Sequence, residues 1–462
     1  MIDSFRNIFA IPDLRRRVMF TFALLAVYRL GAFIPIPGID PVAIAEFTTA
    51  AEGTVLGFLN LFSGGALGRM TVFALGIMPY ISASIILQLL TVVWPYLEKL
   101  SKEGELGRRK ITQYTRYGTI VLSFIQAMGI SFFLERTTAP GGAPLVPEHF
   151  QGWGFRLLTV LTLTTGTAFV MWLGEQISER GIGNGISLII FAGIVVGLPA
   201  AIFNTLTDVQ TGALNIITVV LLVVFMVIVV AAIVYMERAQ RRIPIQYAKR
   251  VVGRRVYGGQ STYLPLRINT GGVIPVIFAA SIMSFPQTLG QMIDNRWLQK
   301  ITEALAWGEP LYNLVYFLSI VFFCYFYTSI IFNPEDTAEN MRKYGGFIPG
   351  IRPGKRTAEF IDKILTRITL VGAVYLALVA ILPEILIAGF KVATIPVIGP
   401  TLDSILPAWF TQGLGVKFFF GGTSLLIVVG VAMDTVNQIE SQLVMRHYDG
   451  FMRKGRVRGR RG

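Results

Sequence analysis

Two uninterrupted apolar stretches restrict what this chain can fold into. Ile216 to Met236 and Leu311 to Phe332 contain no charged side chain. A helix needs about 20 such residues to cross the hydrocarbon core of a bilayer. Only 15% of the 462 residues are charged, against roughly 25% in soluble domains. Because the apolar runs are long and do not alternate with polar residues, an outer-membrane barrel is also disfavoured. The sequence predicts an all-α polytopic membrane protein.

Eight further apolar stretches bring the expected number of membrane-spanning helices to ten. They lie at Val18 to Ile36, Ala74 to Trp94, Gly118 to Leu134, Phe155 to Leu173, Ile182 to Phe203, Gly271 to Phe285, Ile368 to Phe390 and Gly421 to Ile439. No cleavable signal peptide is expected, because the first span is long and lacks a small-residue cleavage site. Ten spans divide into two sets of five with inverted topology, an arrangement that commonly frames a central pathway. The predicted organisation is an N-terminal half (1–205), an external hinge loop (206–212), a C-terminal half (213–445) and a basic tail (446–462).

The basic residues indicate the orientation of the chain. With the N-terminus placed in the cytoplasm, 33 of the 41 lysines and arginines fall in cytoplasmic segments and seven in external ones. Such an excess of positive charge marks the cytoplasmic side of membrane proteins. Both termini are therefore expected in the cytoplasm. The same asymmetry accounts for most of the net charge of +14, which on its own would suggest a nucleic-acid partner.

Residues that carry chemistry are scarce. The chain has one cysteine, Cys324, and two histidines, His149 and His447, too few for a typical zinc site or for nucleophilic catalysis. The glycine-rich run at 181–185 is followed by isoleucine, and Gly354-Lys355 is followed by arginine, so neither is a nucleotide-binding motif. We therefore expect no enzymatic activity, no metal and no cofactor.

Three features of the spans and loops remain open to two interpretations. Isoleucines four residues apart, at Ile77 and Ile81 and again at Ile190 and Ile194, share a helix face. They could close a pore by dewetting or simply face lipid. The glycine-rich segment from Asn60 to Arg69 is too short to span; it could fold back into a funnel or form a surface loop. Arg29, inside the first span, could pair with a carbonyl or extend to the interface.

The two large loops expected in the cytoplasm, 238–267 and 333–367, are likewise open to two interpretations. The first holds eight basic residues, three tyrosines and no acid, so it could bind RNA phosphates or an acidic protein surface. The second presents Arg352 between two helix-breaking Gly and Pro pairs, in the run GIRPG at 350–354. A solvated loop that only sets the topology is the alternative for both.

At these residues the chain resembles the SecY family of channel subunits of the bacterial protein translocase. The resemblance runs nearly end to end and is carried by FIPIPGID (33–40), LFSGGAL (61–67), ALGIMPYISASII (74–86), EGELGRRKITQYTRYGT (103–119), MWLGEQISERGIGNGISLIIFAGIV (171–195), YAKRVVGRRVY (247–257), FNPEDTAENMRK (332–343), FIPGIRPG (347–354) and FGGTSLLIVV (420–429). It implies ten helices in two inverted halves around an hourglass pore. It also implies a lateral gate between the second and third spans on one side and the seventh and eighth on the other.

The resemblance assigns roles to particular residues. The residues matching the family's pore ring are Ile77, Ile81, Ile190, Ile194, Ile277 and Ile427. A plug is expected at about 58–72, with Asn60, Phe62, Ser63, Gly64, Gly65, Gly68 and Arg69 as its characteristic residues. The docking surface for the ribosome and the motor is expected at Arg242, Arg254, Arg255 and Arg352.

The function implied is passage of unfolded secretory polypeptides across the bacterial cytoplasmic (inner) membrane and lateral release of transmembrane segments into it. The implied partners are small SecE- and SecG-type membrane subunits, the SecA motor ATPase, the ribosome through its RNA phosphates, signal peptides, nascent chains and membrane lipid. The external stretch 388–417 is longer than in typical members, and the arginine-rich tail is peculiar to this chain. A secondary transporter of small solutes and an intramembrane enzyme remain as alternatives; both are disfavoured by the scarcity of paired polar groups in the spans.

Overall fold

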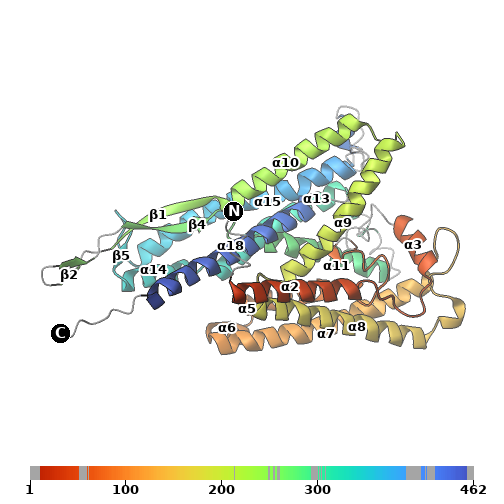
Figure 1. Ribbon diagram of the computed structural model, residues 1–462, viewed down its shortest axis with the longest axis horizontal. Coiled ribbons are helices and arrows are strands. Elements are labelled where there is room, and N and C mark those ends of the chain that lie inside the picture. The colour runs from red at the N-terminus through yellow and green to blue at the C-terminus, as the bar shows by residue number, and fades with distance from the viewer. Residues whose placement is uncertain are drawn as a thin grey trace. The chain divides into compact units, whose positions relative to one another are not determined.

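The computed structural model describes residues 11–50, 60, 62–212, 214–247, 250–252, 255–257, 261–292, 300, 302, 304–306, 308–391, 407–411, 413 and 422–454. The chain divides into two compact units. The first comprises Met1–Leu206, Ser284–Glu303 and Val431–Gly462, and the second comprises Thr207–Met283 and Ala304–Gly430. Figure 1 labels the helices and strands of the two units.

The first unit is a layer of long helices with short elements at its ends. Its elements are α2 (Pro12–Gly31), α3 (Pro41–Ala50), α5 (Met78–Val93), α6 (Pro95–Lys102), α7 (Glu105–Arg136), the 3-10 turn η1 (Glu148–Phe150), α8 (Trp153–Arg180) and most of α9 (Gly185–Gln210). Helices α5, α7 and α8 lie side by side (Figure 1). The buried residues of α7 include Thr115, Thr119, Ser123, Ala127 and Ser131. These small side chains repeat every four residues on one face, so the neighbouring helices can approach closely.

A proline sets the sharpest bend in this unit. Helices α5 and α6 meet at an angle of 98°. Trp94, between them, has extended backbone angles (φ −101°, ψ 112°), and Pro95 is the first residue of α6. Because a residue before proline avoids the helical region, the helix ends there. The predicted span from Ala74 to Trp94 therefore ends where expected, although the helix itself begins only at Met78.

The second unit carries the remaining long helices. Its elements are α10 (Ile216–Arg238), the first part of α11 (Ile274–Met292), α13 (Pro310–Ile331), α14 (Pro334–Lys343), α15 (Lys355–Ala388), α17 (Ala408–Thr411) and the start of α18 (Gly422–Lys454). Asn215 caps α10, because its side-chain oxygen accepts a hydrogen bond from the Ile217 N–H at 3.1 Å. Asn333 caps α14 in the same way through the Glu335 N–H at 3.0 Å. Helices α13 and α15 pack along each other.

A small antiparallel sheet forms part of the second unit. Strand β1 (Gln240–Tyr247) pairs with β4 (Ser261–Arg267) on one side and with the two-residue β5 (Gly346–Phe347) on the other. The short strands β2 (Arg250–Val252) and β3 (Arg255–Tyr257) pair with each other. Ile243 and Ile245 of β1 are buried against Leu266, Met341, Ile348 and Ile361. The basic segment 238–267 is therefore a hairpin with one apolar face, a structure that its basic composition does not suggest.

Each of the ten predicted spans overlaps one helix, although the bounds differ: α2, α5, α7, α8, α9, α10, α11, α13, α15 or α18. Among the described residues, seven helices are by themselves long and apolar enough to cross a membrane, and the bent α5–α6 pair is an eighth candidate. Helix α11 is apolar over only ten residues, Ile274–Met283, and α2 carries four arginines. The all-α membrane architecture is confirmed. The hinge loop predicted at 206–212 is mostly helical, because α9 continues to Gln210.

Candidate functional site

The glycine-rich segment before α5 is a compact set of turns (residues 62–77), not an extended surface loop. The Asn60 side-chain oxygen accepts a hydrogen bond from the Gly68 N–H at 2.6 Å, and the Ser63 hydroxyl accepts one from the Leu67 N–H at 3.0 Å. Gly64 and Gly65 have positive φ angles of 65° and 84°, which glycine adopts without the strain of a side chain. Residues 58, 59 and 61 of the predicted plug lie outside the described residues.

The end of this segment is attached to the strand-like residues after α2. The Ile36 N–H donates to the Met70 carbonyl and the Val72 N–H donates to the Ile34 carbonyl, both at 2.9 Å. Met70 has a φ of 44°, a left-handed conformation that costs a side-chain-bearing residue about 1–2 kcal/mol. It is 5% exposed and belongs to the core on the α3 side of the unit. The attachment therefore fixes a strained residue in place.

The other part of the segment rests on α9. A Cβ atom placed on Gly64 would lie 2.9 Å from the Cα of Gly193, and one placed on Gly193 would lie 2.9 Å from the carbonyl oxygen of Phe62. Only glycine at both positions allows this approach. Ile190 and Ile194, two of the predicted ring residues, occupy the same turn of α9 and are 1% and 0% exposed. Ile190 and Ile194 therefore lie on the turn of α9 that the glycine-rich segment contacts.

Two more predicted ring residues lie at the start of α5. Ile77 precedes the helix, and the Ile81 N–H donates to its carbonyl at 3.1 Å. Both side chains are 4% exposed. A Cβ atom placed on Gly76, the residue before Ile77, would lie 3.7 Å from the Ser63 side chain. The glycine-rich segment is thus next to both isoleucine pairs of the first unit.

The last two predicted ring residues belong to the second unit. Ile277 on α11 is 5% exposed and Ile427 on α18 is 0% exposed. These two helices are in contact one turn away, where a Cβ on Gly430 would overlap the Val273 side chain. Both isoleucines are therefore buried on packed helices. That all six form one ring remains a prediction.

The predicted docking arginines lie on the sheet and on the turn that follows it. Arg242 is exposed on β1, opposite Pro265 of β4. Arg352 is exposed on a turn between Gly350 and Gly354, both of which have positive φ angles. Strand β5, which precedes this turn, pairs with the end of β1, so the hairpin and the turn are joined. Arg255 is in β3, and Arg254 lies outside the described residues.

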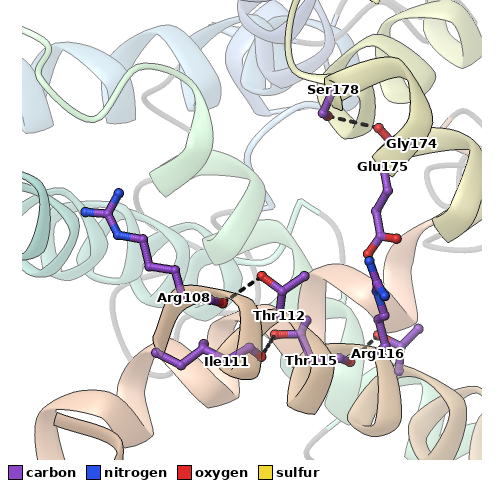
Figure 2. Close-up of polar contacts among 9 residues, drawn as sticks. Arg108, Ile111, Thr112, Thr115, Arg116, Gly174, Glu175 and Ser178 are labelled. Carbon is purple, nitrogen blue, oxygen red and sulfur yellow. Dashed lines mark hydrogen bonds and ion pairs between the residues drawn. The ribbon is translucent and has the colours of Figure 1, made fainter. Parts of the chain in front are cut away.

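Polar contacts that the sequence does not single out fix the junction between α7, α8 and α9. Figure 2 shows Arg116 of α7 facing Glu175 of α8, with 2.8 Å between the guanidinium and the carboxylate. One turn further on, the Ser178 hydroxyl donates to the Gly174 carbonyl at 2.9 Å (Figure 2). The same hydroxyl accepts a hydrogen bond from the Gly185 N–H at 2.8 Å. Ser178 thereby fixes the first residue of α9. The position of the isoleucine turn on α9 is in this way tied to α8.

Two side chains of α2 also contact the glycine-rich segment. The Tyr28 hydroxyl donates to the Ser63 carbonyl at 3.2 Å, and the Arg29 guanidinium donates to the Gly64 carbonyl at 2.6 Å. Neither residue belongs to the predicted site. For Arg29 the sequence offered one signal: a charged residue inside an apolar span usually has a function. Among the described residues, no cluster of three or more histidine, cysteine, aspartate or glutamate side chains could hold a metal ion.

Comparisons with known proteins decide the family. The SecY family model matches residues 71–436. This chain belongs to the SecY family. It is 48% identical over 451 residues to protein translocase subunit SecY of Escherichia coli (strain K12), covering 97% of this chain and 96% of that protein. It is 44% identical over 455 residues to the subunit of Aquifex aeolicus (strain VF5), covering 98% and 100%. SecY is a family of translocase subunits and not of enzymes, and this member is a multi-span membrane protein.

Solved structures share the SecY fold at low sequence identity. A structure described as a protein conducting channel has a TM-score of 0.62 at 19% identity and covers 93% of this chain and 92% of that one. A second, concerned with a plug domain that stabilises the closed state of SecY, has a TM-score of 0.59 at 20% identity, with the same coverage. A third, of canine Sec61 in a ribosome-channel complex, has a TM-score of 0.58 at 17% identity, again with the same coverage. At these identities the likeness concerns the fold.

Proposed function

We propose that this chain is the channel-forming subunit of a protein translocase. It passes unfolded secretory polypeptides across the cytoplasmic membrane and releases transmembrane segments sideways into the lipid. The observation that supports this most directly is the glycine-rich segment lying on the α9 turn that carries Ile190 and Ile194. A compact segment against buried branched apolar side chains is what a closed, plugged pore requires.

An apolar constriction suits an unfolded polypeptide as substrate. Such a substrate presents every kind of side chain in turn, so a lining with fixed polar partners would retain some segments. Buried isoleucines such as Ile81 and Ile194 offer few hydrogen-bonding groups to a passing chain. When no chain is present, an apolar constriction excludes water and ions by dewetting. Ile77, Ile81, Ile190, Ile194, Ile277 and Ile427 together form this constriction, and residues 58–72 form the plug.

The membrane orientation follows from the charges. Both termini, the hairpin 238–267 and the turn around Arg352 are cytoplasmic, because 33 of the 41 basic residues then face the cytoplasm. The membrane is the inner membrane of a bacterium. A transmembrane segment leaves the channel sideways because transfer of its apolar surface into lipid is favourable.

The cytoplasmic arginines form the docking surface for the source of driving energy. Arg242 and Arg352 are exposed on joined elements, so one partner can contact both. The partners are the ribosome, which offers RNA phosphates that arginine binds in bidentate fashion, and the SecA motor ATPase. The ribosome-bound canine Sec61 channel has the same fold. Small SecE- and SecG-type subunits complete the complex in the membrane.

A transport assay in proteoliposomes tests the proposed function. The chain is reconstituted with its small subunits, and a signal-bearing precursor, SecA and ATP are added outside. Protection of the precursor from added protease, lost when ATP is omitted, is expected. A chain that conducts no precursor but accumulates a small solute by itself would instead be a secondary transporter. Two controls are used. One is empty liposomes, and the other is liposomes that contain the chain but receive no signal-bearing precursor.

A further inference from the structure

Helix α2 carries a charged side chain within a predicted membrane span. Arg29 occupies the last turn of α2, within the first predicted span. A charged group in this position is costly unless it has partners. Its guanidinium donates to the Gly64 carbonyl at 2.6 Å and lies 4.7 Å from the centre of the Phe33 ring. The Gly64 carbonyl is therefore a main partner of this charge.

The neighbouring residue makes a parallel contact. Tyr28 is 2% exposed, and its hydroxyl donates to the Ser63 carbonyl at 3.2 Å. Its ring stacks on Phe73 with 5.8 Å between the ring centres. Two consecutive side chains of α2 thus hold two consecutive carbonyls of the glycine-rich segment. The acceptors are main-chain atoms, so the contact depends on where the segment lies and not on its side chains.

The hydrogen bonds that hold the segment together are separate from this contact. Asn60, Ser63 and Gly68 take part in hydrogen bonds inside the segment, and these do not involve α2. Its far end is fixed separately, where Met70 and Val72 pair with the residues after α2. Thr48 of α3 also donates to the Gly68 carbonyl, at 2.8 Å, and the Met70 carbonyl accepts from the Ile36 N–H. Residues 68 to 72 are therefore held by other elements, whereas residues 63 and 64 are held by Tyr28 and Arg29 of α2.

We infer that Arg29, assisted by Tyr28, is a latch that holds the plug closed, and that breaking its bond to the Gly64 carbonyl is a step of channel opening. This rests on the proposed function, since a latch matters only if the segment seals a pore. Moving the segment away separates a guanidinium from its acceptor within the membrane, which is unfavourable. The same bond keeps Gly64 against Gly193 on the isoleucine turn of α9. Arg29 is a positioning residue: it acts through the segment.

Ion conductance of the resting complex in planar bilayers tests the latch. Arg29→Met keeps the length of the side chain and removes its donors. We expect the open probability of the resting channel to rise about tenfold, the factor corresponding to one hydrogen bond from a charged donor. Tyr28→Phe, which keeps the ring stack on Phe73, should raise it less. Arg16→Met, at an exposed position of the same helix, is the matched control and should leave the conductance unchanged.

A deletion of residues 60–69 separates the latch from a general structural role. In that background Arg29→Met should add nothing to the leak, because its partner is gone. An equal further increase would overturn the inference, as would a tightly sealed resting channel in both Arg29→Met and Tyr28→Phe. If Arg29→Met fails to assemble, Tyr28→Phe in the two backgrounds gives the same comparison. If the deletion itself causes no leak, the proposed plug fails; if the deletion leaks and both latch variants stay sealed, only the latch fails.

Discussion

Glycine pairs, rather than the isoleucines, make the most restrictive contact at the residue scale. Gly64 meets Gly193 at a distance that no Cβ atom allows. The sequence shows the glycines but not what they touch, because the partners are separated by well over 100 positions. The same holds for Arg29: its charge inside a span is visible in the sequence, whereas its acceptor, a main-chain carbonyl 35 residues away, leaves no trace in residue identity.

Comparison of two neighbouring glycines isolates this contact. Gly64→Ala introduces a side chain at a positive φ and in overlap with α9. Gly65→Ala has the same unfavourable backbone, costing about 1–2 kcal/mol, but has no heavy atom within 4 Å of its Cβ. We expect Gly64→Ala to raise the resting ion conductance more than Gly65→Ala does. Equal conductance of the two variants in planar bilayers would show that the α9 contact does not seal the pore.

Hydropathy predicts the long elements well and the short ones poorly. Apolar runs locate ten helices because a span must bury its length in lipid. The hairpin of β1 and β4 is different: its apolar alternation is limited to Ile243 and Ile245, amid many basic residues. Helix α9 passes the predicted membrane boundary by seven residues, to Gln210, because polar residues can continue a helix in water. The α5–α6 bend, by contrast, could be read from Pro95.

An ion pair between the end of α7 and the start of α8 should stabilise the first unit. Glu135 and Arg156 lie 2.7 Å apart and are 7% and 23% exposed, and Arg156 also covers the Phe132 ring. Arg156→Met leaves a buried carboxylate without its charged partner, although the Gly152 N–H still donates to it at 2.9 Å, so we expect a loss of about 3 kcal/mol of stability. Lys102→Met, which breaks an exposed pair with Glu98, should cost about 0.5 kcal/mol or less. Thermal unfolding of the purified complex in detergent provides the comparison, and similar losses would refute the prediction.

The turn that carries Arg352 should couple the channel to its driving partner. Arg352→Glu reverses an exposed charge and, because the side chain makes no part of the apolar core, should leave the fold intact. Ribosome binding and stimulation of the SecA ATPase are expected to fall at least about tenfold, the factor of one lost charge-assisted contact. Lys363→Glu makes the same charge change at an exposed position of α15 and should behave like the unaltered chain. Normal precursor export by Arg352→Glu would refute its docking role.

At the scale of the whole molecule, two properties of the sequence predict most of the function. The charge asymmetry of 33 to seven basic residues predicts the orientation, and the end-to-end resemblance to SecY predicts the class of substrate. How far the six isoleucines form one constriction depends on the two compact units together, and sequence patterns within either unit cannot determine it. The central claim is therefore that a polypeptide passes these isoleucines.

Site-specific photo-crosslinking tests that claim most directly. A photoreactive residue replaces Ile81, which is 4% exposed, or Ile86 on the outer face of the same helix, which is 47% exposed. Membranes containing each variant then receive a ribosome with a stalled, signal-bearing nascent chain. The account predicts a crosslink from position 81 to the middle of the nascent chain and little from position 86. Efficient docking of the ribosome with no adduct at position 81 would contradict it, because the proposed docking arginines would then form a binding surface without a conduit.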